Sequence, residues 1–139
     1  MDYYAYFITP FLAWLTAGIS KFIINSIKSK KFAFDMIGYG GLPSNHSAIV
    51  SSTAVLIALK EGVAHPAFGV AVTLAFIVML DANSLRREIG KHAALINSLP
   101  SAVSDRQFLR ERIGHTRMEI AVGVVVGGIV AVIVNSLFG

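Results

Sequence analysis

The sequence contains no cysteine, which excludes disulfides, a thiolate nucleophile and cysteine-ligated metal sites. It is also poor in charge, because Asp, Glu, Lys and Arg make up only 14% of its 139 residues, whereas 55% are hydrophobic. Water-soluble domains carry about 25% charged residues. The low charge and the positive mean hydropathy of +0.67 therefore indicate that much of the surface faces a lipid bilayer.

The length allows one domain, residues 1–139, and most of it is apolar. We predict main helices over residues 4–27, 44–59, 63 or 66 to 80, and 120–137, of which the second and third are borderline in length for spanning a bilayer. The polar stretch 81–97 is expected to be helical without spanning, and residues 106–113 to form a short charged helix. Residues 28–43 and 100–105 are expected to be loops. The predicted fold is an all-α integral membrane bundle of four main helices plus one or two short interfacial helices.

Positive charge is gathered on one side of this predicted bundle. Four alternating helices place residues 21–43 and 81–117 on the same face, and eleven of the twelve Lys and Arg residues fall there. Only Lys60 lies opposite. The positive-inside rule then puts this face in the cytoplasm and both termini outside, in a bacterial-type inner or cell membrane. Cations gathered to bind a phosphate would give the same asymmetry, so this argument favours the orientation without fixing it.

Several ionisable residues lie at the ends of apolar segments, where burial is costly and function is the default explanation. The predicted topology brings all of them to one face: Lys21, His46, Arg86, Arg87, His115 and Glu119. His65 and His92 lack such a setting and are interpreted as structural or surface residues.

Two short stretches on this face suit phosphate chemistry. Residues 40–47 place Gly-rich backbone, a hydroxyl and His46 at a helix start, with Ser44 or Asn45 as N-cap, where free N–H groups favour an anion. His115 and Glu119 are four positions apart, so on a helix they face each other. Glu119 would then accept the proton of one ring nitrogen and leave the other nitrogen as a nucleophile.

Three motifs in order resemble a known family. Residues 41–48 resemble its Pro-Ser-x-His motif, residues 81–87 an Asp-Ala-x-x-x-Arg-Arg element, and residues 114–119 a final His-x-x-x-acid motif. Together they resemble the divergent branch of the type 2 phosphatidic acid phosphatase family, also called acid phosphatase or vanadium-dependent haloperoxidase-related proteins. The resemblance covers nearly the whole chain.

The resemblance implies a membrane phosphatase without metal or cofactor. It implies that His115 attacks phosphorus to give a phosphohistidine, that Glu119 orients it, and that His46 protonates the leaving alkoxide. Fixed cations would neutralise the transferring phosphoryl group. The expected substrate is a phosphomonoester or pyrophosphate on a lipid or polyprenyl tail. The expected partners are this lipid phosphate and membrane lipids, with no nucleic acid, and so small a bundle suits a homo-oligomer.

Departures from the wider family leave the division of phosphate binding open. Its first motif pairs Lys with Arg-Pro, which is absent here, and Leu109-Arg110 stands where Ser-Arg is usual. Glu119 replaces the more familiar Asp. The residues predicted to bind phosphate are Lys21, Lys30, Ser44, Asn45, Arg86, Arg87 and Arg110, supported by Asp81, Gly41 and Gly114. Asp81 is also able simply to pair with one of the two arginines.

Other functions compete with this hypothesis. Lys28, Lys30 and Lys31 suit interfacial anchors that reach toward lipid headgroups. His46, His115 and Glu119 have a spacing that zinc tolerates, although the surrounding cations would repel a metal. A non-enzymatic subunit would use the basic face to bind anionic lipid or a partner, and would pack its last helix through the Gly123 and Gly127 face. Vanadate-dependent peroxidase chemistry is disfavoured in so small a membrane site, where vanadate should inhibit instead.

Overall fold

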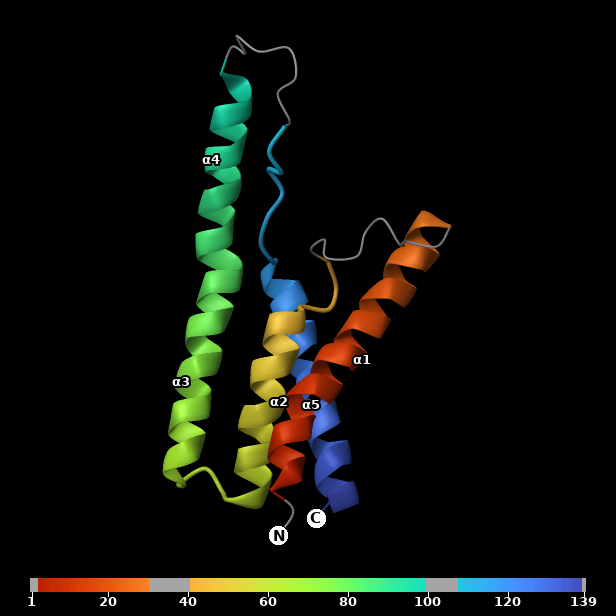
Figure 1. Ribbon diagram of the computed structural model, residues 1–139, viewed down its shortest axis with the longest axis vertical. Helices are drawn as coiled ribbons and strands as arrows, with labels where there is room; N and C mark the ends of the chain where they lie inside the picture. The colour runs from red at the N-terminus through yellow and green to blue at the C-terminus, as the bar shows by residue number, and fades with distance from the viewer. Residues whose placement is uncertain (1–2, 31–40, 100–107, 139) are drawn as a thin grey trace.

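A computed structural model describes residues 3–30, 41–99 and 108–138, and this part of the chain is helical with no strand. Its elements are α1 (Tyr4–Ser29), α2 (Asn45–Lys60), α3 (Pro66–Leu80), a π-helical turn η2 (Asp81–Leu85), α4 (Arg86–Ser98) and α5 (Arg117–Phe138) (Figure 1). Three helical stretches are long and apolar enough to cross a membrane: Tyr4–Ser29, Pro66–Ser98 and Arg117–Phe138. The predicted all-α membrane bundle is confirmed.

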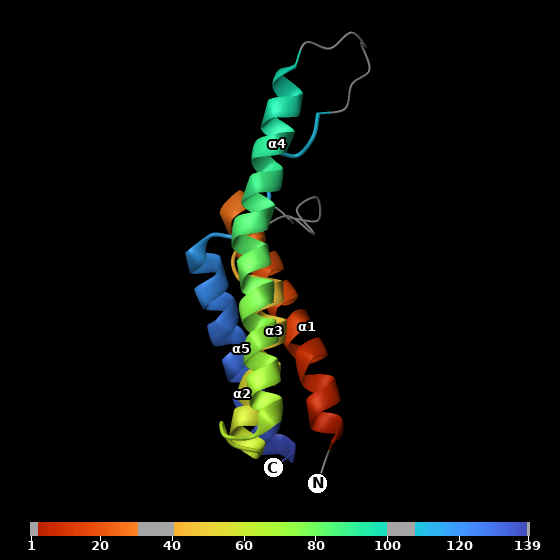
Figure 2. The ribbon, with the colours of Figure 1, turned by 90° about the vertical axis from the view of Figure 1, so that its left-hand side faces the viewer.

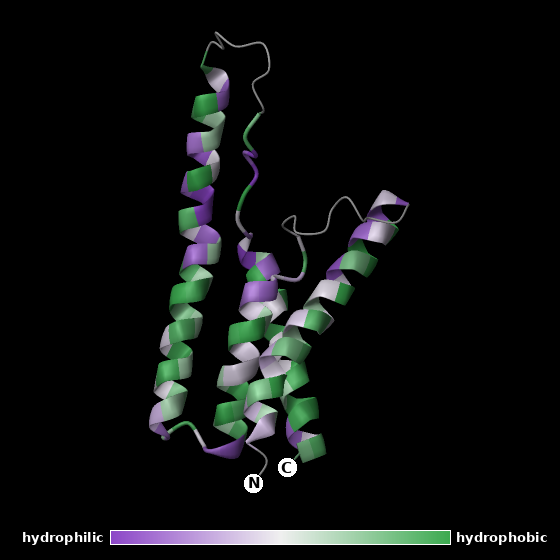
Figure 3. Cartoon of the chain, viewed as in Figure 1, coloured by the Kyte–Doolittle hydropathy of each residue, from purple (hydrophilic) through white to green (hydrophobic). Residues whose placement is uncertain are grey.

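The third and fourth helices form one continuous rod. The stretch 81–97 is helical as predicted, but η2 joins it to α3 without a break. Nothing in the sequence stops the helix here, because neither Gly nor Pro occurs between Leu80 and Gly90. The 33 residues of the rod span about 50 Å, whereas a hydrocarbon core is about 30 Å thick. The rod therefore projects beyond the bundle as its polar α4 end (Figure 3).

The predicted short helix over 106–113 is wrong in its described part, residues 108–113, which are irregular. This segment returns along α4 and bonds to it by side chains. The Asn97 amide donates to the Leu109 carbonyl (2.7 Å) and accepts from the Leu109 N–H (2.9 Å). Gly90 admits the Glu111 carbonyl at a point where a Cβ would collide with it. The predicted loop 100–105 and residues 31–40 of the loop 28–43 lie outside the described residues.

The short helix α2 lies at the centre and contacts α1, α3 and α5. Its 16 residues span about 24 Å, and three of its serines are buried. Two of these satisfy their hydroxyls within the helix, because Ser51 donates to the Ser47 carbonyl (2.6 Å) and Ser52 to the Ile49 carbonyl (2.8 Å). These buried hydroxyl groups therefore have hydrogen-bond acceptors, so α2 can lie in a low-dielectric surrounding.

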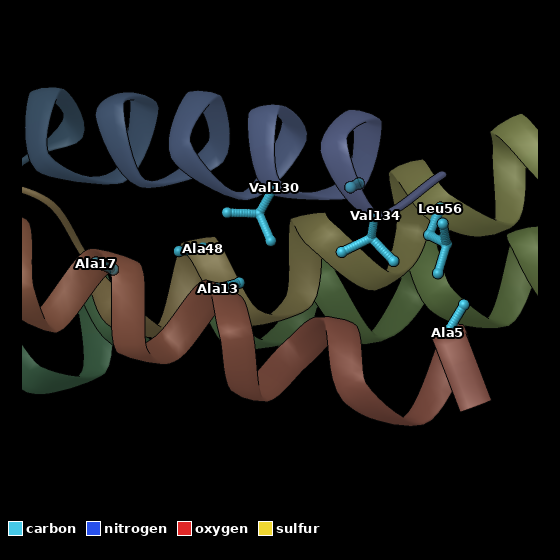
Figure 4. Packing of buried hydrophobic residues seen from close by; sticks show 8 residues of the cluster. Ala5, Ala13, Ala17, Ala48, Leu56, Val130 and Val134 are labelled. Carbon is cyan, nitrogen blue, oxygen red and sulfur yellow. The ribbon is translucent and has the colours of Figure 1, made fainter. Parts of the chain in front are cut away.

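Small side chains allow the helices to approach closely. The core cluster consists of Ala5, Ala13, Ala17, Ala48, Leu56, Val130, Ala131 and Val134, contributed by α1, α2 and α5 (Figure 4). On α5, Gly123 lies against the Ser44 carbonyl, and Gly127 against Ser51 and the Ala48 carbonyl. The small-residue face predicted on the last helix therefore packs against α2.

Large apolar side chains cover the outside of the bundle. Trp14 on α1, Phe76 on α3 and Ile129 on α5 are 54%, 64% and 55% exposed. Figure 2 shows the α3–α4 rod in front, with α5 and α1 on either side of it. This outer surface is suited to lipid.

Gly127→Ala tests the close α2–α5 contact, with Gly128→Ala as a matched control on the same helix. The new methyl at position 127 meets the Ala48 backbone carbonyl, whereas nothing lies within 4 Å of a Cβ at position 128. We expect Gly127→Ala to lower the free energy of unfolding by about 1–3 kcal/mol. Gly128→Ala should be neutral or stabilising, because Ala is the better helix former. Thermal unfolding in detergent measures both, and equal midpoints would contradict the packing.

Candidate active site

Two backbone hydrogen bonds tie together three segments that are distant in sequence. The Ser44 N–H donates to the Glu119 carbonyl (3.0 Å), which joins the start of α2 to the first turn of α5. The His115 N–H donates to the Ala82 carbonyl (2.9 Å), which joins the segment before α5 to η2. The polar ends of α2, η2 and α5 therefore meet at one end of the bundle.

The α2 side of the site begins with a capped helix. Of the two predicted N-caps, Ser44 and Asn45, Ser44 is the one found. It is fully buried, and its hydroxyl oxygen accepts from the Ser47 N–H (3.4 Å) and from the Ser47 hydroxyl (3.1 Å). Gly41 has φ = +140°, a conformation that L side chains rarely adopt, so the turn before the helix favours glycine. This capped start fixes the direction in which His46 leaves the helix.

The α5 side begins with a capping box that includes the predicted His–acid pair. Thr116 and Glu119 cap each other, because the Glu119 N–H donates to the Thr116 Oγ1 (3.2 Å) and the Thr116 N–H to Glu119 Oε2 (2.9 Å). The same Oε2 lies 3.1 Å from His115 Nδ1. One carboxylate oxygen thus caps the helix and orients the imidazole.

Thr116 was not among the predicted site residues. The Thr-x-x-Glu pattern at positions 116–119 is a sequence signature of a helix start. It would have identified Thr116 if Glu119 had been considered as a capping residue as well as a histidine partner.

The two predicted histidines face each other across these helix ends. Their ring centroids are 6.2 Å apart and the rings are inclined at 60°. His115 is buried, with 9% of its surface exposed, whereas His46 is exposed. With Nδ1 of His115 engaged by Glu119, Nε2 is the nitrogen left for chemistry.

Two of the predicted cations reach this pair. Lys21, half-buried on α1, and Arg86, at the start of α4, both interact electrostatically with His46 and His115. Arg86 Nε also lies 3.5 Å from Asp81 Oδ2, so Asp81 pairs with one of the two arginines. Gly114 permits this approach, because its φ is +101° and a Cβ there would lie 3.2 Å from Arg86 Cβ.

The other predicted phosphate-binding residues lie further out. Lys30 ends α1 nine residues after Lys21, roughly 13 Å along the helix, where α1 inclines away from the bundle (Figure 1). Arg87 is exposed, and so is Arg110, whose Nε donates to the Arg112 carbonyl (3.1 Å). Lys31 lies outside the described residues.

Asn45, the first residue of α2, faces α1 near Gly18. Its Oδ1 is buried and has no hydrogen-bond partner among the described residues. A buried acceptor without a partner is costly, so Asn45 is available to a ligand that brings a donor.

Burial lowers the pKa of His115 below its usual value, and this effect outweighs the hydrogen bond to Glu119, which raises the pKa. The positive charges of Lys21 and Arg86 lower it further. The neutral imidazole, which has a free lone pair, is therefore favoured near neutral pH.

A metal site is not evident in residues 3–30, 41–99 and 108–138, where no three His, Asp or Glu side chains converge as ligands. Besides Glu119 at His115 and Asp81 at His46, the charged groups that act on both histidines are the cations Lys21 and Arg86. Such a setting attracts an anion.

Comparisons with known proteins find a matching family and a similar membrane protein. A family model described as "Divergent PAP2 family" matches residues 4–130. An "uncharacterized membrane protein YuiD" of Bacillus subtilis (strain 168) is 29% identical over 143 residues, covering 91% of this chain and 90% of the relative. No solved structure matches the chain. The membrane relative and the three spanning helices together make the chain an integral membrane protein.

We expect His115 to titrate below its ordinary pKa of about 6.5, and Glu119→Gln to lower that pKa further. The amide keeps an acceptor oxygen for the Thr116 N–H but loses the charge that stabilises the imidazolium. NMR titration of histidine-labelled protein in micelles measures both values, with His115→Gln to assign the signal. Because the folded-state pKa is depressed, the stability linked to this group is lost as pH falls through it. An unchanged pKa in Glu119→Gln would contradict the pairing.

Proposed function

The chain belongs to the divergent PAP2 family, and we propose that it is a metal-independent membrane phosphatase. Its substrate is a phosphomonoester or pyrophosphate of a lipid or polyprenyl tail, hydrolysed through a phosphohistidine intermediate. The proposal rests chiefly on the bond between His115 Nδ1 and Glu119 Oε2 (3.1 Å) opposite the His46 ring. A nucleophilic imidazole oriented by a carboxylate, with a second titratable group facing it, suits phosphoryl transfer through a covalent enzyme intermediate.

In the first step, the lone pair of His115 Nε2 attacks phosphorus and forms an N–P bond. The P–O bond to the lipid breaks, and its electrons stay on the leaving oxygen. Protonated His46 gives its proton to that oxygen, which releases the lipid as an alcohol. Glu119 holds the Nδ1 proton throughout and stabilises the positive charge that develops on the His115 ring.

In the second step, water breaks the N–P bond. Neutral His46 takes a proton from the water as its oxygen attacks phosphorus, and the bonding electrons return to His115 Nε2. Inorganic phosphate leaves, and both histidines regain their starting states. The greater exposure of His46 supports this assignment, because it must meet both the leaving group and water, whereas buried His115 meets phosphorus alone.

Lys21 and Arg86 supply the charge that the transferring phosphoryl group needs. Arg86 offers a planar donor pair and Lys21 a point charge, both already fixed near the histidines. Partial burial lowers the pKa of His46, and the charges of Arg86 and Lys21 lower it further. A bound phosphate offsets their charge, so substrate binding itself favours the protonated His46 that the first step uses.

The orientation that we propose puts the site on the cytoplasmic side. The site lies at the end of the bundle that carries nine of the ten Lys and Arg residues that the structure describes, opposite Lys60, the start of α1 and the end of α5 (Figure 1). Lipid phosphates in the cytoplasmic leaflet are then within reach.

The alternative is a non-enzymatic membrane subunit that binds anionic lipid or a partner protein through its basic face. That hypothesis packs the last helix through Gly123 and Gly127, and both glycines lie against α2 of the same chain, so they offer no surface to a partner. It also gives no reason for the bond between His115 and Glu119.

His115→Ala should abolish phosphate release, because it removes the imidazole that accepts the phosphoryl group in the proposed mechanism. Purified protein in detergent is assayed against phosphatidate, phosphatidylglycerol phosphate and polyprenyl phosphates, with vanadate as inhibitor. His92→Gln is the control, since His92 is exposed on α4. Full activity in His115→Ala, or turnover of no lipid by the wild type, would overturn the proposal.

The effect of His46→Gln on the rate of hydrolysis should depend on the leaving group of the substrate. With an alkyl phosphate, loss of the proton donor should cost about 10²–10⁴ in rate. With an aryl phosphate, whose phenolate leaves without a proton, phosphorylation should be nearly normal, and acid-labile phosphoenzyme should accumulate because water is no longer activated. Rapid-quench phosphate assays measure both steps. An equal loss for both leaving groups would exclude His46 as the acid.

A further inference from the structure

A groove lies beside the candidate active site, on the outer surface between α3, η2 and the start of α5. Its volume is about 320 Å³, and it is lined by Phe76, Met79, Leu80, Asn83, Ser84 and Arg117. This is the size range in which proteins hold small molecules or parts of larger ones. Phe76 and Leu80 are 64% and 49% exposed, so the groove opens to the surroundings of the bundle.

The lining changes from apolar to polar along the membrane normal. Phe76, Met79 and Leu80 belong to the last turns of α3, within a spanning segment. Asn83, Ser84 and Arg117 follow at the polar end, beside the candidate active site. The groove is therefore shaped for an amphiphile with a hydrocarbon tail in the bilayer and an anionic group at its surface.

Arg117 supplies charge complementarity at the polar end. It forms no ion pair with any residue that the structure describes. It occupies the first position of α5, where a cation is unfavourable to the helix dipole. Helix stability therefore does not account for a cation at position 117, whereas binding of an anionic headgroup does.

The polar end of the groove also adjoins the site in space. Asn83 directly follows Ala82, whose carbonyl accepts the His115 N–H (2.9 Å), and Arg117 lies two residues after His115. A lipid in the groove would carry its headgroup to the outer rim of the site.

We propose that this groove binds the hydrocarbon tail of the lipid phosphate substrate, which enters sideways from the bilayer, and that Arg117 attracts its anionic headgroup. As an account of the substrate this rests on the proposed phosphatase function. It makes the substrate an acyl- or prenyl-chain phosphate and gives the α3–α5 side of the bundle the role of entrance.

A fluorescence experiment tests binding without relying on catalysis. The chain has a single tryptophan, Trp14, so Trp14→Phe combined with Phe76→Trp moves the only reporter to the groove. The protein is reconstituted in phosphatidylcholine vesicles that contain either brominated phosphatidate or the same fraction of brominated phosphatidylcholine. We expect phosphatidate to quench the reporter at position 76 more strongly, with an affinity advantage of about fivefold that Arg117→Gln removes.

Two controls make this result specific. Native Trp14, on the lipid-facing surface of α1, should be quenched equally by the two lipids. Arg112→Gln, which removes an exposed cation outside the groove, should leave the preference at position 76 intact. Equal quenching by both lipids at position 76, or a preference that survives Arg117→Gln, would overturn the groove.

An activity measurement separates this inference from the proposed function. Met79→Trp fills the groove and should lower kcat/KM for a long-chain phosphate while leaving a short-chain, water-soluble phosphate unaffected. Ile77→Trp, on the same helix but outside the groove, is the control. If the wild type hydrolyses lipid phosphates and Met79→Trp keeps the long-chain preference, the proposed role of the groove is wrong and the proposed phosphatase function is unaffected. If no lipid phosphate is hydrolysed but the Arg117-dependent quenching persists, the proposed phosphatase function is wrong and the groove is a binding site for anionic lipid.

Discussion

Glu119 is the residue on which the arrangement of the polar end depends. Its carboxylate caps α5 through Thr116 and holds His115, and its backbone carbonyl accepts the Ser44 N–H at the start of α2. One residue therefore fixes the direction of a helix, the orientation of an imidazole and the join to a second helix. In a low-dielectric surrounding, each bond is stronger than in water and each unmade bond is costlier. The constraint is mutual, because His115 keeps its orientation only while α5 keeps its cap.

The distance between the two histidines is set away from the polar end, by the packing of small residues. Gly123 and Gly127 bring α5 against the backbone of α2, and alanines bring α1 against both. The hydrogen bond from the Ser44 N–H to the Glu119 carbonyl holds the first turns of these two helices at the same level. His46 and His115 then face each other at 6.2 Å without any direct bond between them. Close packing of small apolar residues within the bilayer therefore helps to set the distance between the two histidines at the polar end of the bundle.

Much of this arrangement was predictable from the sequence, because apolar length and residue spacing are local properties. The four main helices, the N-cap at Ser44 and the pairing of His115 with Glu119 follow from such local patterns. The division among the cations was predictable only in part. The sequence singled out Lys21 at the end of an apolar segment, but the distance of Lys30 from the site depends on the incline of α1. The predicted helix was wrong over residues 108–113 because tertiary bonds to Asn97, together with the space at Gly90, overrode local helix propensity. The continuity of α3 with α4 was missed because a change of polarity was interpreted as an end of the helix.

The π-helical turn between α3 and α4 also fixes the rotational phase of the rod. Successive residues of an α-helix are about 100° apart around its axis, so losing one residue from positions 81–85 would turn everything beyond it by about that angle. Gly90 would then no longer meet the Glu111 carbonyl, and Arg86 would point away from the histidines. Substitutions in this turn change one side chain, whereas a single-residue deletion would displace a whole face of α4. Length in this segment is therefore under stronger constraint than residue identity.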